Sequence, residues 1–204
     1  MVKILQDLKL TVIASVVLVI ALIVILLLWY PGAFPKFDHK WWTHLFRWLH
    51  VAGGVMWIGH LYYFNFTQAP TVPKIPAELR PAIGKFILPE ALFWFRWGAM
   101  WTIVTGLILA WMSGYLGDAI LLGFTSGSAA HTSIGIGMWL GTIMWFNVWF
   151  IIWPNQKKVM GLTPADDAAK AAAARIASLT SRANTMLSLP MLYAMTSLSM
   201  PKLF

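Results

Sequence analysis

Five long stretches of this 204-residue chain contain almost no charged residues, and this feature constrains the fold more than any other. Each is close to the roughly 20 apolar residues that a helix needs to cross a bilayer. The stretches predict spans at about 8–30, 42–67, 91–113, 131–153 and 183–200. We therefore expect an all-α integral membrane protein, with one domain over residues 1–204 and a bundle of about five transmembrane helices. The first stretch lacks a small-residue cleavage site, so we expect it to be retained.

The composition excludes several other classes of protein. Hydrophobic residues make up 59% of the chain and charged residues 11%, with a mean hydropathy of +0.71, which is unlike a soluble domain. The absence of cysteine excludes disulfides, iron–sulfur clusters and covalently attached haem, so redox chemistry would need a non-covalent cofactor. The net charge of +8 fits loops that face anionic lipid, and we expect no nucleic-acid partner.

The positions of the positive charges predict the orientation. With the N-terminus inside, 11 of the 15 lysines and arginines fall in inside segments and four fall outside. Inside segments of membrane proteins are enriched in Lys and Arg, so this count favours an N-in, C-out topology. The expected external loop 114–130 contains neither residue type.

Two connections have distinct sequence patterns. The segment 68–89 contains five prolines, which predict an extended cytoplasmic loop with one short turn of helix. The run 163–166 (Thr-Pro-Ala-Asp) predicts a threonine cap and a proline at the first position of a cytoplasmic helix, over 167–179, before the last span. Pro190 should kink that last span.

Histidines inside membrane-length sequence are the strongest candidates for chemistry, because an imidazole in hydrocarbon needs a partner. His50 and His60 both lie in the second span, but about 15 Å apart along a helix, so they cannot share one metal ion. His131 begins the fourth span from the outside, in the same leaflet as His50. His39 and His44 fall in the external loop or at the interface.

Two imidazoles on different helices of one leaflet are what axial ligation of haem b requires. The sequence therefore predicts His50 and His131 as ligands of a haem iron, with His60 as the alternative ligand. Arg47, one turn before His50, could pair with a propionate. The glycines after the two histidines would leave bare surface for the macrocycle or simply allow close helix packing. They are Gly53, Gly54, Gly135, Gly137 and Gly141.

Tryptophans repeat at helical spacing in two of the expected spans. One set flanks Arg96, and such stripes could line a cofactor or could pack against lipid or a partner subunit. Because they leave more apolar surface than a small bundle covers, we expect a homo-oligomer or a larger complex with other membrane subunits. The two sets are Trp94, Trp97 and Trp101, and Trp145, Trp149 and Trp153.

Seven runs of the chain carry a recognisable family pattern, over residues 48–59, 62–66, 94–100, 141–145, 147–149, 152–156 and 182–192. These runs resemble the membrane domain of the bacterial membrane-bound urate oxidases. The stretch around His50 is also similar, more weakly, to the haem-binding helix of the membrane protoporphyrinogen oxidase family. His60 stands where the urate oxidase pattern has an aliphatic residue.

The resemblance implies a multi-pass protein of the bacterial inner membrane in a redox setting. Members of that family end in a cytochrome c domain, which these 204 residues do not contain, so a separate cytochrome c is an expected partner. Three functions follow. The first is a haem b-bearing subunit that transfers electrons in a larger redox complex. The second is a cofactor-free accessory subunit, and the third is an oxidoreductase that acts with the separate cytochrome.

Overall fold

The computed structural model describes residues 2–29 and 37–196, and within these ranges every regular element is a helix. The chain divides into two compact units, residues 1–42 and 43–204. The described part of the first unit holds α1 (Val2–Gln6), α2 (Leu8–Trp29) and the first turn of α3 (His39–Tyr62). The all-helical fold class expected from the sequence is confirmed.

Helix α2 begins where Asp7 caps it. The Asp7 carboxylate accepts hydrogen bonds from the backbone N–H groups of Lys9 at 2.8 Å and Leu10 at 3.2 Å, which satisfies two donors that have no partner inside the helix. From there α2 is apolar on every face, and none of its residues is buried. A helix that is apolar all round suits hydrocarbon better than water.

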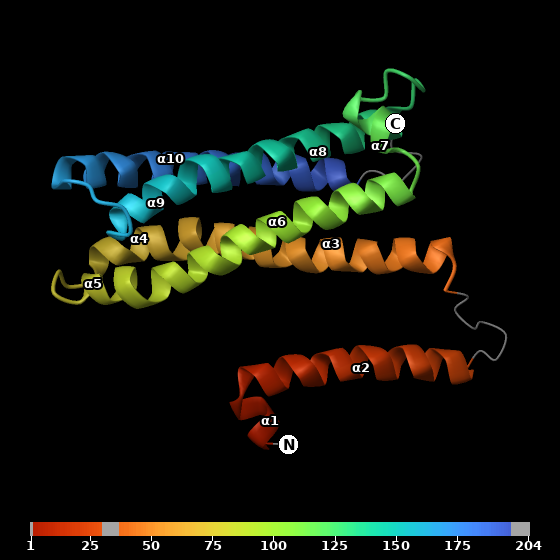
Figure 1. The fold of residues 1–204 in the computed structure, drawn as a ribbon, viewed down its shortest axis with the longest axis horizontal. Helices are drawn as coiled ribbons and strands as arrows, with labels where there is room; N and C mark the ends of the chain where they lie inside the picture. Colours follow the sequence, from red (N-terminus) through yellow and green to blue (C-terminus); the bar gives the residue numbers. More distant parts are fainter. Residues whose placement is uncertain (1, 30–36, 197–204) are drawn as a thin grey trace. The chain divides into compact units, whose positions relative to one another are not determined.

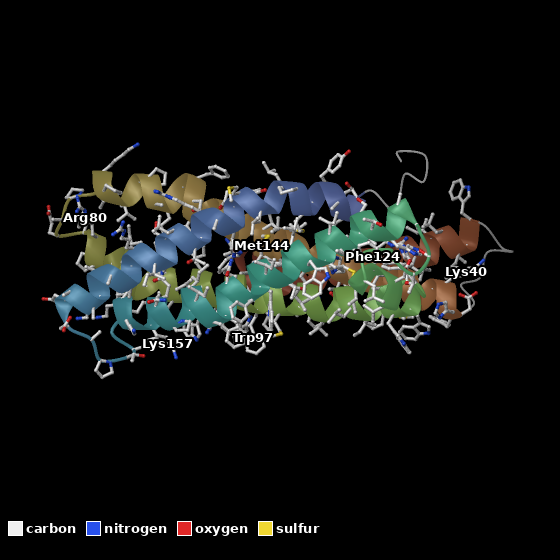
Figure 2. The ribbon with its side chains drawn as sticks, turned by 90° about the horizontal axis from the view of Figure 1, so that it is seen from above. Lys40, Arg80, Trp97, Phe124, Met144 and Lys157 are labelled. Atoms are coloured by element: carbon white, nitrogen blue, oxygen red, sulfur yellow. The ribbon has the colours of Figure 1, made fainter. Side chains whose placement is uncertain are left out.

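The second unit is built from long helical runs that lie side by side (Figure 1). Short helices connect them at both ends, and Figure 2 shows Arg80 toward one end, Phe124 toward the other and Met144 between them. The runs are α3 with η1 (Tyr63–Gln68); α6 (Leu88–Met112); α8 (Ala129–Phe146) with η4 (Asn147–Ile152) and α9 (Trp153–Val159); and α10 (Asp167–Thr196). The short helices α4 (Ala69–Thr71), η2 (Val72–Lys74), α5 (Arg80–Ala82) and η3 (Ile83–Ile87) precede α6, and α7 (Leu116–Ile120) follows it.

Three of the helices in the described ranges are long and apolar enough to cross a membrane: Leu8–Trp29, Arg80–Met112 and Ala129–Val159. Helices α3 and α10 are long enough, but their imidazole, amide, hydroxyl and charged side chains lower their hydropathy. The structure is therefore compatible with a membrane protein, while the count of five spans stays a prediction.

Polar side chains join α10 to its neighbours inside the bundle. The buried Asn184 donates to the Met144 carbonyl oxygen at 3.0 Å and accepts a hydrogen bond from Asn147 Nδ2 at 2.8 Å. One turn along, the hydroxyls of Tyr62 and Ser188 lie 3.0 Å apart. Hydrogen bonds between helices hold a bundle together where lipid supplies no hydrophobic driving force. The packed apolar core around them includes Trp57, Leu61, Phe95, Met144 and Val148.

The expected extended loop at 68–89 is wrong in detail, because most of this segment is helical. Four of its five prolines occupy the first or second position of a helical element, α4, η2, α5 or α6, where a proline is tolerated. Only residues 75–79 lie outside a helix. The prolines at those first positions are Pro70, Pro73, Pro81 and Pro89.

The helix expected after residue 163 begins later than the sequence predicted. The Asp166 carboxylate, and not Thr163, accepts the capping hydrogen bond, from the Ala169 N–H group at 2.7 Å. Pro164 therefore precedes the helix. The segments expected as a cytoplasmic helix and as a fifth span form one continuous helix, α10, which runs past Pro190 to Thr196. Residues 197–200 of the expected span lie outside the described residues.

Candidate functional site

His50 lies on α3 and is held by α6. Its Nδ1 donates to the Thr102 carbonyl oxygen at 2.9 Å. A carbonyl oxygen can only accept, so the proton is on Nδ1 and the neutral ring has its lone pair on Nε2. The ring fits because residue 106 is glycine, where an added Cβ would lie 2.7 Å from His50 Cε1. The contact with α6 thus fixes both the position and the tautomer of the imidazole.

The glycines near the two candidate ligands serve mainly as contact surfaces between helices. An added Cβ would lie 2.6 Å from Trp101 Cδ1 at Gly53 and would meet the carbonyl oxygen of Ala119 at Gly135. Neighbouring helices therefore cover these two positions, in place of the bare surface that the sequence suggested. The nearest atoms to an added Cβ are at 3.2 Å for Gly137 and at 4.0 Å for Gly54 and Gly141.

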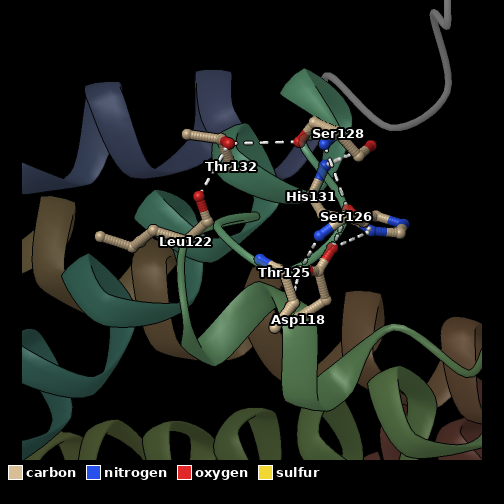
Figure 3. A network of polar contacts seen from close by, with 7 residues as sticks. All are labelled: Asp118, Leu122, Thr125, Ser126, Ser128, His131 and Thr132. Atoms are coloured by element: carbon tan, nitrogen blue, oxygen red, sulfur yellow. Dashed lines mark hydrogen bonds and ion pairs between the residues drawn. The ribbon is translucent and has the colours of Figure 1, made fainter.

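His131 lies in the first turn of α8, in a network of polar groups that Figure 3 shows from close by. Its Nδ1 is 2.6 Å from the Asp118 carboxylate of α7. The hydroxyls of Ser126 and Thr125 also donate to this carboxylate, and the side chain of Ser128 caps the helix by accepting from the His131 N–H group at 3.3 Å. As at His50, an oxygen acceptor holds Nδ1 and leaves Nε2 as the free ring nitrogen.

The carboxylate of Asp118 is the most strongly perturbed group outside the expected spans. The hydroxyls of Ser126 and Thr125, and then the His131 ring, hold the pKa of Asp118 well below its ordinary value. These donors favour the charged form of the carboxyl group. The loop that supplies them bends sharply at Leu122 and Gly123, which have φ angles of +53° and +74°.

Tyr115 links this network to α3. Its ring stacks on the His131 ring with centroids 5.8 Å apart. Burial raises the pKa of Tyr115, and the positive charge of Arg47 lowers it by less, so Arg47 acts on the same end of the bundle. Among the described residues no contact joins the rings of His50 and His131 directly. No group of three or more His, Cys, Asp or Glu side chains in those residues could hold a metal ion.

His60 lies elsewhere, in an open groove between α3 and the start of α6. Its Nδ1 donates to the carbonyl oxygen of Met56, one turn back on its own helix, at 2.8 Å. The groove has a volume of about 670 Å³ and is mostly apolar. The structure therefore separates His60 from the end of the bundle that holds His50, as the spacing along the helix predicted.

The tryptophan stripes pack partly against each other and against Arg96. The Arg96 guanidinium lies over the Trp153 ring at 3.3 Å from its centroid and over the Trp149 ring at 5.5 Å. The Trp97 and Trp149 rings meet edge to face at 5.5 Å. Cation–π contacts of this kind favour a cation beside an aromatic surface, so Arg96 helps to join α6 to η4 and α9.

The sequence interpretation missed several polar residues of this structure. Asp118 in the short helix α7 and Ser126 in the following loop show no regular spacing in the sequence, and only the fold brings them to His131. Asn147 and Asn184 did carry a signal, because an amide inside membrane-length sequence needs an internal partner. That signal predicts that both asparagines are buried, but it does not predict which helix each one bonds to.

The Asp118 network predicts a pH-dependent contribution to stability. Since the pKa of Asp118 is lower in the folded protein than its ordinary value of 3.8, this contribution is present above pH 3.8 and is lost as the pH falls through the folded pKa. We expect Asp118→Asn to lower the Tm at pH 6 and to lower it less as the pH drops below 3.8, as measured by thermal unfolding in detergent. Asp167→Asn, at an exposed carboxylate, is the control. It should change neither the Tm at pH 6 nor the way the Tm depends on pH. A Tm difference for Asp118→Asn that does not vary with pH would contradict this.

Comparison with known families supports the resemblance over one part of the chain. Residues 119–204 match the family described as urate oxidase N-terminal. The match runs from within α7 through α8, η4 and α9 to the end of the chain, and it includes His131. It supports membership of a urate oxidase-like family, while His50 lies outside the matched range. No match was found among curated proteins or among solved structures.

Proposed function

We propose that this chain is a membrane subunit that binds haem b and transfers electrons within a larger redox complex. The observation that carries the proposal is shared by His50 and His131. In each, Nδ1 donates to an oxygen acceptor, so the neutral ring carries its lone pair on Nε2. Histidines that ligate metals are held in this way, because the second hydrogen bond fixes the ring and makes Nε2 a better donor of electrons.

The support for this cofactor is the chemistry of the two side chains, since neutral imidazole nitrogens are haem-iron ligands. His50 and His131 would hold the iron, Arg47 would pair with a propionate, and Gly54 would leave room beside the ring. When bound, haem supplies one-electron transfer that the side chains alone cannot. His60 is the alternative ligand, since the groove beside it provides open volume.

A cofactor-free accessory subunit is the second candidate function. Its support is the contact of Gly53 and Gly135 with neighbouring helices, together with exposed aromatic side chains on α6 and η4. A reduced-minus-oxidised visible spectrum of the purified chain separates the two. A Soret band and a sharp α band support haem, and their absence supports the accessory subunit. If haem is present, urate-dependent reduction of an added cytochrome c would indicate the oxidoreductase.

The proposal includes an N-in, C-out topology with five spans in a bacterial inner membrane. The distribution of Lys and Arg supports it, with 11 on one side and four on the other. We expect a reporter fused after Gly127 to be external and one fused after Gly161 to be cytoplasmic. The opposite pattern would overturn the orientation, and with it the placement of His50 and His131 in the outer leaflet.

We also propose that the chain works in an oligomer or with other subunits. Large aromatic side chains such as Trp94, Trp101 and Phe150 are exposed in the second unit. Exposed apolar surface on this scale suits protein contacts as well as lipid. Native mass spectrometry in a mild detergent should show species above the 22.9 kDa monomer. A monomer alone, under conditions that preserve a known membrane oligomer, would contradict this.

A further inference from the structure

We propose that the groove between α3 and α6 binds the headgroup of a lipid-soluble hydroquinone. The groove has a volume of about 670 Å³, and its walls come from α3 and η1 on one side and from η3 and α6 on the other. Among its apolar side chains are His60 and Tyr63 on one wall and Glu90 on the other. This inference goes beyond the proposed function and does not depend on haem.

His60 and Glu90 present hydrogen-bond acceptors on opposite walls of the groove. His60 donates from Nδ1 to the Met56 carbonyl, so its neutral ring offers the lone pair of Nε2. Glu90 accepts from Trp94 Nε1 at 3.0 Å through Oε1, and its other oxygen is a further acceptor. No described residue donates to His60 Nε2. The acceptors on the two walls complement a ligand with two donors, as the hydroxyls of a hydroquinone are and the carbonyls of a quinone are not, and the Tyr63 hydroxyl of the lining can itself donate to or accept from such a ligand.

The apolar surface of the groove indicates how such a ligand arrives. Val55 and Phe86 on its rim are 70% and 68% exposed, so the groove opens toward the surroundings of the bundle through hydrocarbon side chains. An added Cβ on Gly59 would meet nothing within 4 Å, which leaves a flat surface for an aromatic ring. A planar ring with an apolar tail matches both features and could enter from the bilayer.

Glu90 also has a structural role, which the test must separate from binding. It lies in the first turn of α6, directly after Pro89, where a carboxylate interacts favourably with the helix N-terminus. The variants that probe binding are therefore placed on the opposite wall. Gly59→Leu places bulk in the groove from a position where an added Cβ would meet nothing within 4 Å, and His60→Ala removes the acceptor.

The experiment measures binding of a radiolabelled benzoquinol with a decyl tail to the full chain in nanodiscs, under anaerobic reducing conditions. We expect saturable binding above empty nanodiscs, and at least about tenfold weaker binding for both Gly59→Leu and His60→Ala. The oxidised quinone should also bind more weakly than the quinol. His44→Ala, outside the groove, is the control and should bind as the wild type does.

Three outcomes would overturn the inference. They are no saturable binding above empty nanodiscs, equal binding by wild type and Gly59→Leu, and stronger binding of the quinone than of the quinol. Loss of a haem spectrum in Gly59→Leu would also overturn it, because the groove would then hold haem. Failure of the haem proposal leaves these binding measurements unaffected, so the two failures are distinguishable.

Discussion

Alanine at position 50 should abolish the low-spin haem spectrum of the purified protein, whereas alanine at position 39 should leave it unchanged. His50→Ala removes the Nε2 donor that the Thr102 contact holds in place. Without it the iron loses an axial ligand and becomes high-spin, or the haem is lost. His39 begins α3 and is the matched control. The measurement is the visible spectrum, together with the haem content per chain.

A structural role for His50 would give a different result, because its ring also packs on Gly106. Adding free imidazole to His50→Ala should restore the low-spin spectrum if the ring is a ligand, since the small molecule can occupy the vacated position. His60→Ala should keep its spectrum. A normal spectrum in His50→Ala, with loss in His60→Ala, would move the haem to the α3–α6 groove.

Gly135→Ala should be the most destabilising small substitution in the second unit. The added methyl group would meet the Ala119 carbonyl oxygen, which belongs to the backbone and cannot rotate away. Overpacking of this kind typically costs about 1–3 kcal/mol. Helix α7 would have to move, and Asp118 would leave His131. We expect a Tm several degrees lower and loss of the pH dependence that Asp118 confers.

Gly141→Ala is the matched control on the same helix. Its added Cβ would have only the end of the Met195 side chain near it, at 4.0 Å. Alanine favours a helix over glycine by about 1 kcal/mol, so this variant should be neutral or slightly more stable. Equal stability of Gly135→Ala and Gly141→Ala would show that α7 does not pack on α8 as described.

The sequence was sufficient to predict the long helices of the fold. Apolar length placed α2, α6 and the continuous run of α8 with η4 within a few residues, because the length of an uncharged stretch that crosses a bilayer is set by the bilayer thickness. The histidines in such stretches were identified because an imidazole in hydrocarbon needs a partner, and this argument does not require knowledge of the fold. The spacing of His50 and His60 also predicted their separation, since both lie on the single helix α3.

Contacts between helices could not be predicted in the same way. The carbonyl that holds His50 is 52 residues away, and nothing in either segment selects the other. Asp118 reaches His131 only because the loop turns sharply at Leu122 and Gly123. The prolines of segment 68–89 misled the interpretation, because a proline that breaks a helix interior is tolerated in a first turn.

The most direct test of the central claim is the electron paramagnetic resonance spectrum of the oxidised protein, recorded with its haem content. If His50 and His131 ligate one haem b, the wild type should contain one haem per chain with a low-spin bis-imidazole signal. That signal should disappear in both His50→Ala and His131→Ala and persist in His60→Ala. The account would be contradicted by a wild type without haem, or by a low-spin signal that survives the loss of both His50 and His131.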